Sequence, residues 1–210
     1  MSVVCLVSGG IDSLVMSKFL EKEGEEILPI FIDYGQLANS KEWHACKIVF
    51  DKVDLPQPTK IDLSGFGNIF KSGITDSNKD IYDDAFIPGR NLLFLTVAAS
   101  YAYINNLNKI AIGLLSEENH MFPDQTEEFI VNANVAVNSA LNTQFTILTP
   151  LINFTKDEVI KLAEDFELPL ELTYSCHQGK EKYCGDCVAC KEIIDSMGLD
   201  FFENISGGEK

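Results

Sequence analysis

The chain has 210 residues, 46% of them hydrophobic, and a formal net charge of −16 at pH 7. This length and composition suit one domain with a sizeable core and exclude a disordered chain. The longest apolar run, 92–104, is interrupted by polar side chains and is shorter than the ~20 residues of a membrane span. The acidic charge argues against direct binding of nucleic acid, because it repels a phosphate backbone.

The first residues show no basic start and no small-residue cleavage site, so they do not resemble a secretion signal. We therefore expect a cytoplasmic protein with no membrane partner.

Short apolar runs alternate with helical patterns along the first part of the chain. The patterns predict strands at 3–7, 27–33, 59–63, 109–114 and 145–148, and helices at 12–23, 40–54, 90–106, 125–141 and 155–166. The alternation predicts an α/β fold with a doubly wound, parallel five-stranded sheet.

The remaining segments show no regular pattern. Residues 64–88, rich in Gly, Ser, Asn and Asp, and residues 116–124 are predicted to be loops. Periodicity stops after residue 166. We therefore expect a main domain at 1–166 and a small C-terminal subdomain at 167–210.

A glycine-rich hexapeptide lies between the first predicted strand and the first predicted helix, where a helix N-terminus can bind an anion. It consists of Ser8, Gly9, Gly10, Ile11, Asp12 and Ser13. The glycines bring backbone N–H groups close to a phosphate, and the serine hydroxyls add donors. Asp12 does not suit a bare anion, which suggests that it helps to place Mg²⁺.

A glycine pair alone is also common at ordinary strand–helix corners. The hexapeptide lacks the ending of a P-loop and the spacing of a dinucleotide fingerprint. It resembles instead the SGGxDS motif of the PP-loop ATP pyrophosphatases. That resemblance implies binding of ATP and its cleavage to AMP and pyrophosphate.

Four of the six cysteines are clustered near the end of the chain: Cys176, Cys184, Cys187 and Cys190. In a reducing compartment this spacing predicts a metal site rather than disulfides. Four thiolates enclose Zn²⁺ with no open position, so we expect a structural zinc knuckle. An iron–sulfur cluster is the alternative, although the Cys-Pro ending of the ferredoxin motif is absent.

Both motifs and several others resemble the 7-cyano-7-deazaguanine synthase family (QueC). The matching segments are SGGIDS at 8–13, FIDYGQ at 31–36, FIPGRNLLFLTVAASYA at 86–102, IGLLSEENHMFPD at 112–124, TPL at 149–151 and SCHQGKEKYCGDCVAC at 175–190. The resemblance implies two ATP-dependent steps on 7-carboxy-7-deazaguanine: ammonia first gives the amide, which then becomes the nitrile. It also implies a homodimer with one zinc ion per subunit.

The resemblance and the predicted crevice together suggest roles for individual residues. Asp12 and Arg90 are the candidate catalytic residues, because Arg90, the chain's one arginine, can neutralise a carboxylate or phosphate. The candidate substrate-binding residues are Asp33, Tyr34, Gln36, Phe86, Arg90, Asn91, Glu117, Phe122 and Asp124. Several of them also have an ordinary structural alternative: a surface position for Arg90, a polar strand end for Asp33, Tyr34 and Gln36, and a core aromatic ring for Tyr34 and Phe122.

The chain departs from the usual family pattern in three places, all in predicted crevice loops. They are Leu37 and Ala38 after the DYGQ segment, residues 117–120, and residues 122–126. A similar pattern occurs in QueC-like enzymes of antiphage systems, which join the deazaguanine acid to a protein amine. A tRNA-modifying PP-loop enzyme and a non-catalytic nucleotide-binding module are further alternatives.

Overall fold

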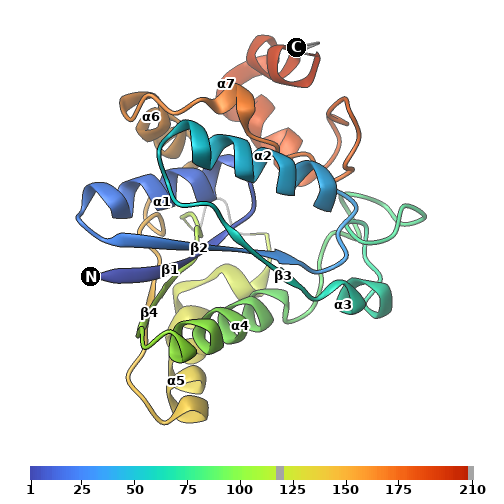
Figure 1. Ribbon diagram of the computed structural model, residues 1–210. Helices are drawn as coiled ribbons and strands as arrows, with labels where there is room; N and C mark the ends of the chain where they lie inside the picture. Colours follow the sequence, from blue (N-terminus) through green and yellow to red (C-terminus); the bar gives the residue numbers. More distant parts are fainter. Residues whose placement is uncertain (117–120, 208–210) are drawn as a thin grey trace.

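The computed structural model of the chain describes residues 1–116 and 121–207 (Figure 1). It contains a parallel five-stranded sheet in the order β3-β2-β1-β4-β5. The strands are β1 (Ser2–Val7), β2 (Glu26–Asp33), β3 (Thr59–Asp62), β4 (Lys109–Ala111) and β5 (Thr146–Leu148). The predicted fold class is therefore confirmed.

Helices cover both faces of this sheet (Figure 1). One face carries α1 (Ile11–Lys22), α2 (Asn39–Lys52), α6 (Lys156–Asp165) and α7 (Val188–Gly207), and the other carries α4 (Arg90–Ile104) and α5 (Glu127–Leu141). Alternate residues of β1 serve the two layers, since Val3 and Cys5 pack in the first core and Val4 and Leu6 in the second. The small buried side chains of α4 let that helix pack closely on the sheet.

The sheet order also places the site. Strand β1 lies between β2 and β4 in the sheet. The chain passes from β1 through α1 to β2 on one side, and it reaches β4 on the other side only after β3 and α4. Where the winding reverses, the loops at the carboxyl ends of β1 and β4 diverge, and ligands bind in such a crevice. Among the described residues, no helix is both long and apolar enough to cross a membrane.

Three elements differ from the sequence-based expectation. Strand β4 ends at Ala111, because the chain turns beyond it with the Leu114 N–H donating to the Ile112 carbonyl. The predicted loop 64–88 begins with a short helix, α3 (Ser64–Ile69), and its Ile74 is buried in the core. Helix α7 begins within the cysteine cluster, at Val188, and occupies a region where no regular element was expected.

The structures of α7 and of the 64–88 segment, which differ from the expectation, have local causes. Residue Gly198 interrupts α7 with a φ of 80° and ψ of 167°, which breaks the helical periodicity that a sequence pattern needs. In the 64–88 segment, the Gly67 N–H donates to the Tyr34 carbonyl over 2.8 Å, which fixes α3 against the end of β2.

Two glycines of α3 provide a matched test of this packing. A Cβ at Gly67 would lie 2.4 Å from the Tyr34 carbonyl oxygen, whereas one at Gly65 meets nothing within 4 Å. We expect Gly67→Ala to lower the free energy of unfolding by roughly 1–3 kcal/mol, and Gly65→Ala to raise it by about 0.5 kcal/mol. Urea denaturation measures both, and equal effects of the two substitutions would contradict the close contact.

Candidate active site and metal centre

A cavity of about 300 Å³ lies at the carboxyl ends of β1, β2 and β4. Its wall includes Leu6 and Val7 at the end of β1, Ile32 in β2, and residues 112–115 after β4. The strand order predicts a crevice at this position. The cavity volume is at the lower end of the range for small-molecule sites, which is roughly 300–1,000 Å³.

The glycine-rich hexapeptide forms one end of the cavity. Five of its residues line the wall, namely Ser8, Gly10, Ile11, Asp12 and Ser13. Gly9 lies behind them at a φ of +81°, and a Cβ there would approach the Glu42 carbonyl oxygen to 2.4 Å. The turn therefore needs glycine for its conformation and for its close packing on α2.

The serines organise the backbone of this turn. The Ser13 hydroxyl receives a hydrogen bond from the Ser8 N–H over 3.1 Å and donates one to the Gly10 carbonyl over 3.2 Å. Helix α1 begins directly after Gly10, with no side chain capping its N-terminus. The free N–H groups and the partial positive charge of this helix end suit a phosphate group.

Lys156 adds a positive charge at the same end of the cavity as the N-terminus of α1. Its side chain is 7% exposed, and its ammonium lies 2.6 Å from Asp12 Oδ1 and 3.8 Å from Glu192 Oε2. Burial lowers the pKa of Lys156, but the two carboxylates outweigh burial and hold the pKa above its usual value. Lys156 therefore stays protonated beside the glycine-rich turn, where it is paired with two carboxylates.

Polar residues also gather at a second part of the wall, formed by Tyr34, Gln36, Glu42, Arg90 and His177. We call these five residues the polar cluster. The guanidinium of Arg90 lies 5.8 Å from the centre of the Tyr34 ring. The Gln36 amide donates to Glu42 Oε2 over 2.9 Å.

Burial shifts the pKa values in the polar cluster. It raises the pKa of Glu42 to about 7, although the Gln36 hydrogen bond and the Arg90 charge oppose it. It raises the pKa of Tyr34 to about 12. Burial and the Arg90 charge lower the pKa of His177 to about 4, so this imidazole is neutral at pH 7.

The cavity also includes Asn91 and Phe122, two further residues predicted to bind substrate. Asn91 is buried beside Asp124, whose carboxylate accepts from the Asn91 N–H over 3.2 Å and whose carbonyl accepts from the Asn91 amide over 2.8 Å. These bonds fix the first turn of α4, on which Arg90 lies.

Three other predicted substrate-binding residues do not line the cavity. Asp124 is engaged with α4, as described above. Asp33 pairs with Lys60 over 2.8 Å and accepts from the Asn39 amide over 2.6 Å. Phe86 stacks on Phe122, with the ring centres 5.1 Å apart, and so lies behind a wall residue. Glu117 falls outside the described residues.

Sequence reasoning missed Lys156, Glu42 and Glu192, which all line the cavity. For Lys156 a signal existed: it is the first residue of α6 and follows Thr155, which forms a capping box with Glu158. A helix N-terminus disfavours a cation, so a lysine there needs another reason. Glu42 and Glu192 carried no such signal, because acidic residues on helices are usually exposed.

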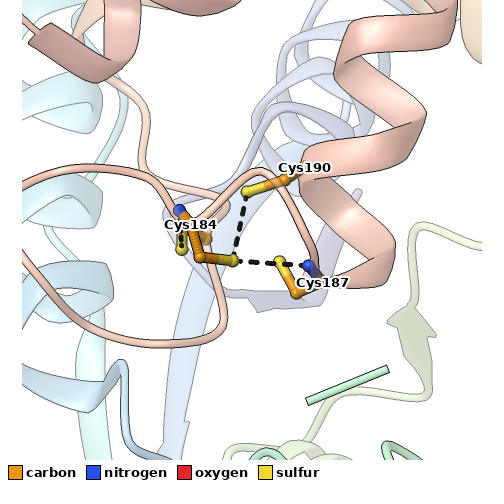
Figure 2. Close-up of side chains that lie close together, drawn as sticks. Cys184, Cys187 and Cys190 are labelled. Carbon is orange, nitrogen blue, oxygen red and sulfur yellow. Dashed lines mark hydrogen bonds between the residues drawn. The ribbon is translucent and has the colours of Figure 1, made fainter. Parts of the chain in front are cut away.

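The four cysteines meet as predicted. Their Sγ atoms all lie within 4.8 Å of one another, and those of Cys184 and Cys190 are 3.8 Å apart. Figure 2 shows three of these side chains converging from the turn and the start of α7. A tetrahedral zinc ion with bonds of ~2.3 Å separates its sulfurs by roughly 3.8 Å. The cluster can therefore hold a metal ion such as Zn²⁺.

Backbone groups support thiolates in this cluster. The Cys187 N–H donates to Cys184 Sγ over 3.3 Å, and the Cys184 N–H donates to Cys176 Sγ over 3.3 Å. The same segment contributes to the cavity wall, through residues such as Tyr174, Ser175 and Glu192. The metal centre and the candidate active site are therefore adjacent parts of one structure.

Comparison with known proteins agrees with this geometry. The profile of the family described as "Queuosine biosynthesis protein QueC" matches residues 2–196. The chain belongs to the QueC family.

Curated relatives of the QueC family chain include the 7-cyano-7-deazaguanine synthase of Nautilia profundicola, which is 34% identical over 90% of this chain and 89% of its own length. The synthase of Campylobacter fetus is 32% identical over 90% of this chain and 88% of its own. Among solved structures, the NMN synthetase of Francisella tularensis is similar, with a TM-score of 0.57 at 15% identity, over 97% of this chain and 74% of its own. That last similarity concerns the fold alone.

The metal centre of this QueC family member yields one prediction. Cys187→Ser should lose bound zinc and lower the melting temperature, because three thiolates leave the shell incomplete and the turn unsupported. The matched control is Cys5→Ala, a buried cysteine in β1 outside the cluster, which should keep about one zinc per chain. Metal analysis of the purified proteins decides, and full zinc in Cys187→Ser would contradict the assignment.

The pKa of Glu42 yields a second prediction. Between its unfolded value of 4.5 and its folded value of about 7, the folded chain retains a proton that the unfolded chain loses. Folding stability therefore falls as the pH rises through this range, and Glu42→Gln escapes the loss. The free energy of unfolding of Glu42→Gln, relative to that of the unsubstituted protein, should therefore rise by about 2 kcal/mol when the pH is raised from 5 to 8.

Urea denaturation at both pH values measures this difference. The exposed Asp51→Asn on the same helix serves as the control and should show no such change. A pH-independent difference for Glu42→Gln would show that its carboxyl ionises normally.

Proposed function

We propose that the protein is an ATP-dependent ligase that converts 7-carboxy-7-deazaguanine to 7-cyano-7-deazaguanine. The observation that carries the proposal is that residues of the glycine-rich turn, Lys156 and Arg90 line the same cavity. Membership of the QueC family and the named synthases among the relatives support it.

In this proposal the turn and the N-terminus of α1 bind the triphosphate of ATP. Lys156 is a positive charge in contact with Asp12 of the turn, and it can exchange this pairing for a phosphate oxygen. Mg²⁺ bound to the triphosphate would supply further charge neutralisation, and Asp12 would hold it, since carboxylate oxygens are ligands that Mg²⁺ prefers.

Arg90 binds the carboxylate of the substrate and orients it toward the α-phosphorus. A carboxylate oxygen attacks this phosphorus, the bond to the β-phosphate oxygen breaks, and pyrophosphate leaves. Ammonia then adds to the acyl carbon and displaces AMP, which gives the amide and releases a proton. The cavity contributes position and charge, because the attacking groups come from the substrates themselves.

A second ATP is consumed in the same way. The amide oxygen attacks the α-phosphorus and again releases pyrophosphate. The activated amide then loses AMP and protons, and its carbon–nitrogen bond becomes the nitrile. Both oxygens of the original carboxylate leave in AMP, so each nitrile should be accompanied by two AMP and two pyrophosphate.

Ammonia is the nitrogen donor in this proposal. Transfer to a protein amine is the alternative, and the named relatives favour the nitrile synthase over it. A homodimer and a cytoplasmic location stay predictions.

The test is incubation of the protein with 7-carboxy-7-deazaguanine, ATP, Mg²⁺ and ammonium, with products identified by mass. We expect the nitrile, and Lys156→Met should lower kcat/KM for ATP by about 100-fold because it removes the phosphate-binding charge. The control is Lys161→Met, an exposed lysine on the same helix.

A product that stops at the amide or the adenylate would contradict nitrile synthesis. Equal activity of the Lys156→Met and Lys161→Met variants would contradict the role of Lys156.

A further inference from the structure

The cavity wall includes three carboxylates among the described residues, and only one of them has no cation in contact. Asp12 and Glu192 both lie against Lys156. The third carboxylate, Glu42, is 9% exposed and receives a single hydrogen bond from the described chain, from the Gln36 amide. Its remaining acceptor positions are therefore available to a ligand.

The backbone around Glu42 holds this carboxylate in place. Gln36 is fixed at both ends of its amide: its Oε1 accepts from the Tyr34 N–H over 3.0 Å, while its Nε2 donates to Glu42. The main chain at Glu42 also packs on Gly9, where no Cβ fits. A buried acceptor held this rigidly is typical of a group that recognises a ligand.

Polar atoms without partners lie in the same polar cluster. Within the described chain, neither Arg90 Nε nor His177 Nδ1 has a hydrogen-bond partner, although both atoms are buried. The charge of Arg90 acts on both Glu42 and His177. Buried polar atoms are normally paired, so these atoms indicate where polar groups of a ligand belong, and Arg90 Nε requires an acceptor.

We propose that Glu42 selects a guanine-type base, by accepting hydrogen bonds from its ring N–H and its exocyclic amino group while Arg90 donates to the neighbouring carbonyl. Such a base presents two donors and one acceptor along one edge, which matches a carboxylate beside a guanidinium. In a 7-carboxy-7-deazaguanine the carbonyl and the carboxylate are adjacent, so one guanidinium can serve both. This inference rests on the proposed function.

Other acidic residues fit this role less well. Asp33 is paired with Lys60, and Asp124 accepts from the first turn of α4, so neither reaches the cavity wall. The adenine of ATP suits Glu42 less well than guanine, because its ring acceptor lies beside its amino group and repels a carboxylate. Glu42 therefore belongs to the acceptor substrate rather than to ATP.

The experiment measures equilibrium binding by calorimetry, independently of turnover. The probes are 7-carboxy-7-deazaguanine and the matching compound without the exocyclic amino group, and the proteins are the unsubstituted chain and Glu42→Gln. We expect the unsubstituted chain to prefer the amino compound by about 10- to 100-fold, as a hydrogen bond to a buried charge allows. In Glu42→Gln the preference should fall to within about threefold, and the Kd for ATP should not change.

Glu42→Gln keeps the shape of the side chain, and its thermal unfolding shows whether the protein is folded. Asp51→Asn, an exposed carboxylate on the same helix, is the matched control and should keep the full preference. An unchanged preference in Glu42→Gln would overturn the inference, as would weaker binding of ATP with unchanged binding of the acid, or no binding of either base.

The failures of the two proposals are distinguishable. A chain that binds the acid with the expected preference but forms no nitrile would contradict the proposed function and leave the base selection intact. A chain that forms the nitrile and keeps its preference after Glu42→Gln would contradict the base selection alone.

Discussion

The ammonium group of Lys156, on α6, lies between the carboxylates of Asp12 on α1 and Glu192 on α7. The fold brings these three helices together from distant parts of the chain. A buried lysine is costly unless it is paired, and a lysine at a helix N-terminus is disfavoured as well. The two carboxylates offset both costs. They thereby join the glycine-rich turn, α6 and α7 into one wall.

This arrangement explains why the candidate metal centre lies beside the candidate active site. The cysteines fix the start of α7, and Glu192 lies two residues beyond the last of them. A metal ion held by this cluster would therefore stabilise the part of the chain that carries Glu192 and the wall residues near His177. A zinc ion can be structural in its chemistry and still determine the shape of the cavity.

The cavity has two chemically different ends. One end combines glycine backbone, a helix N-terminus and a lysine, and it suits phosphates whatever base they carry. The polar cluster combines Glu42, Gln36, Tyr34, Arg90 and His177, and it suits a specific pattern of donors and acceptors. Arg90 lies on the first turn of α4 and belongs to this cluster. In the proposed function it binds the substrate carboxylate.

Local patterns were sufficient for much of this protein. Alternating apolar runs determined the parallel α/β sheet, and the SGGIDS turn and the cysteine spacing identified the family, because each depends on residues close in sequence. The role of Lys156, the position of Glu42 on the wall and the diversion of Asp33 and Asp124 into structural contacts were decided by the tertiary structure alone. These depend on which side chains burial brings together from distant segments, and no local pattern records that.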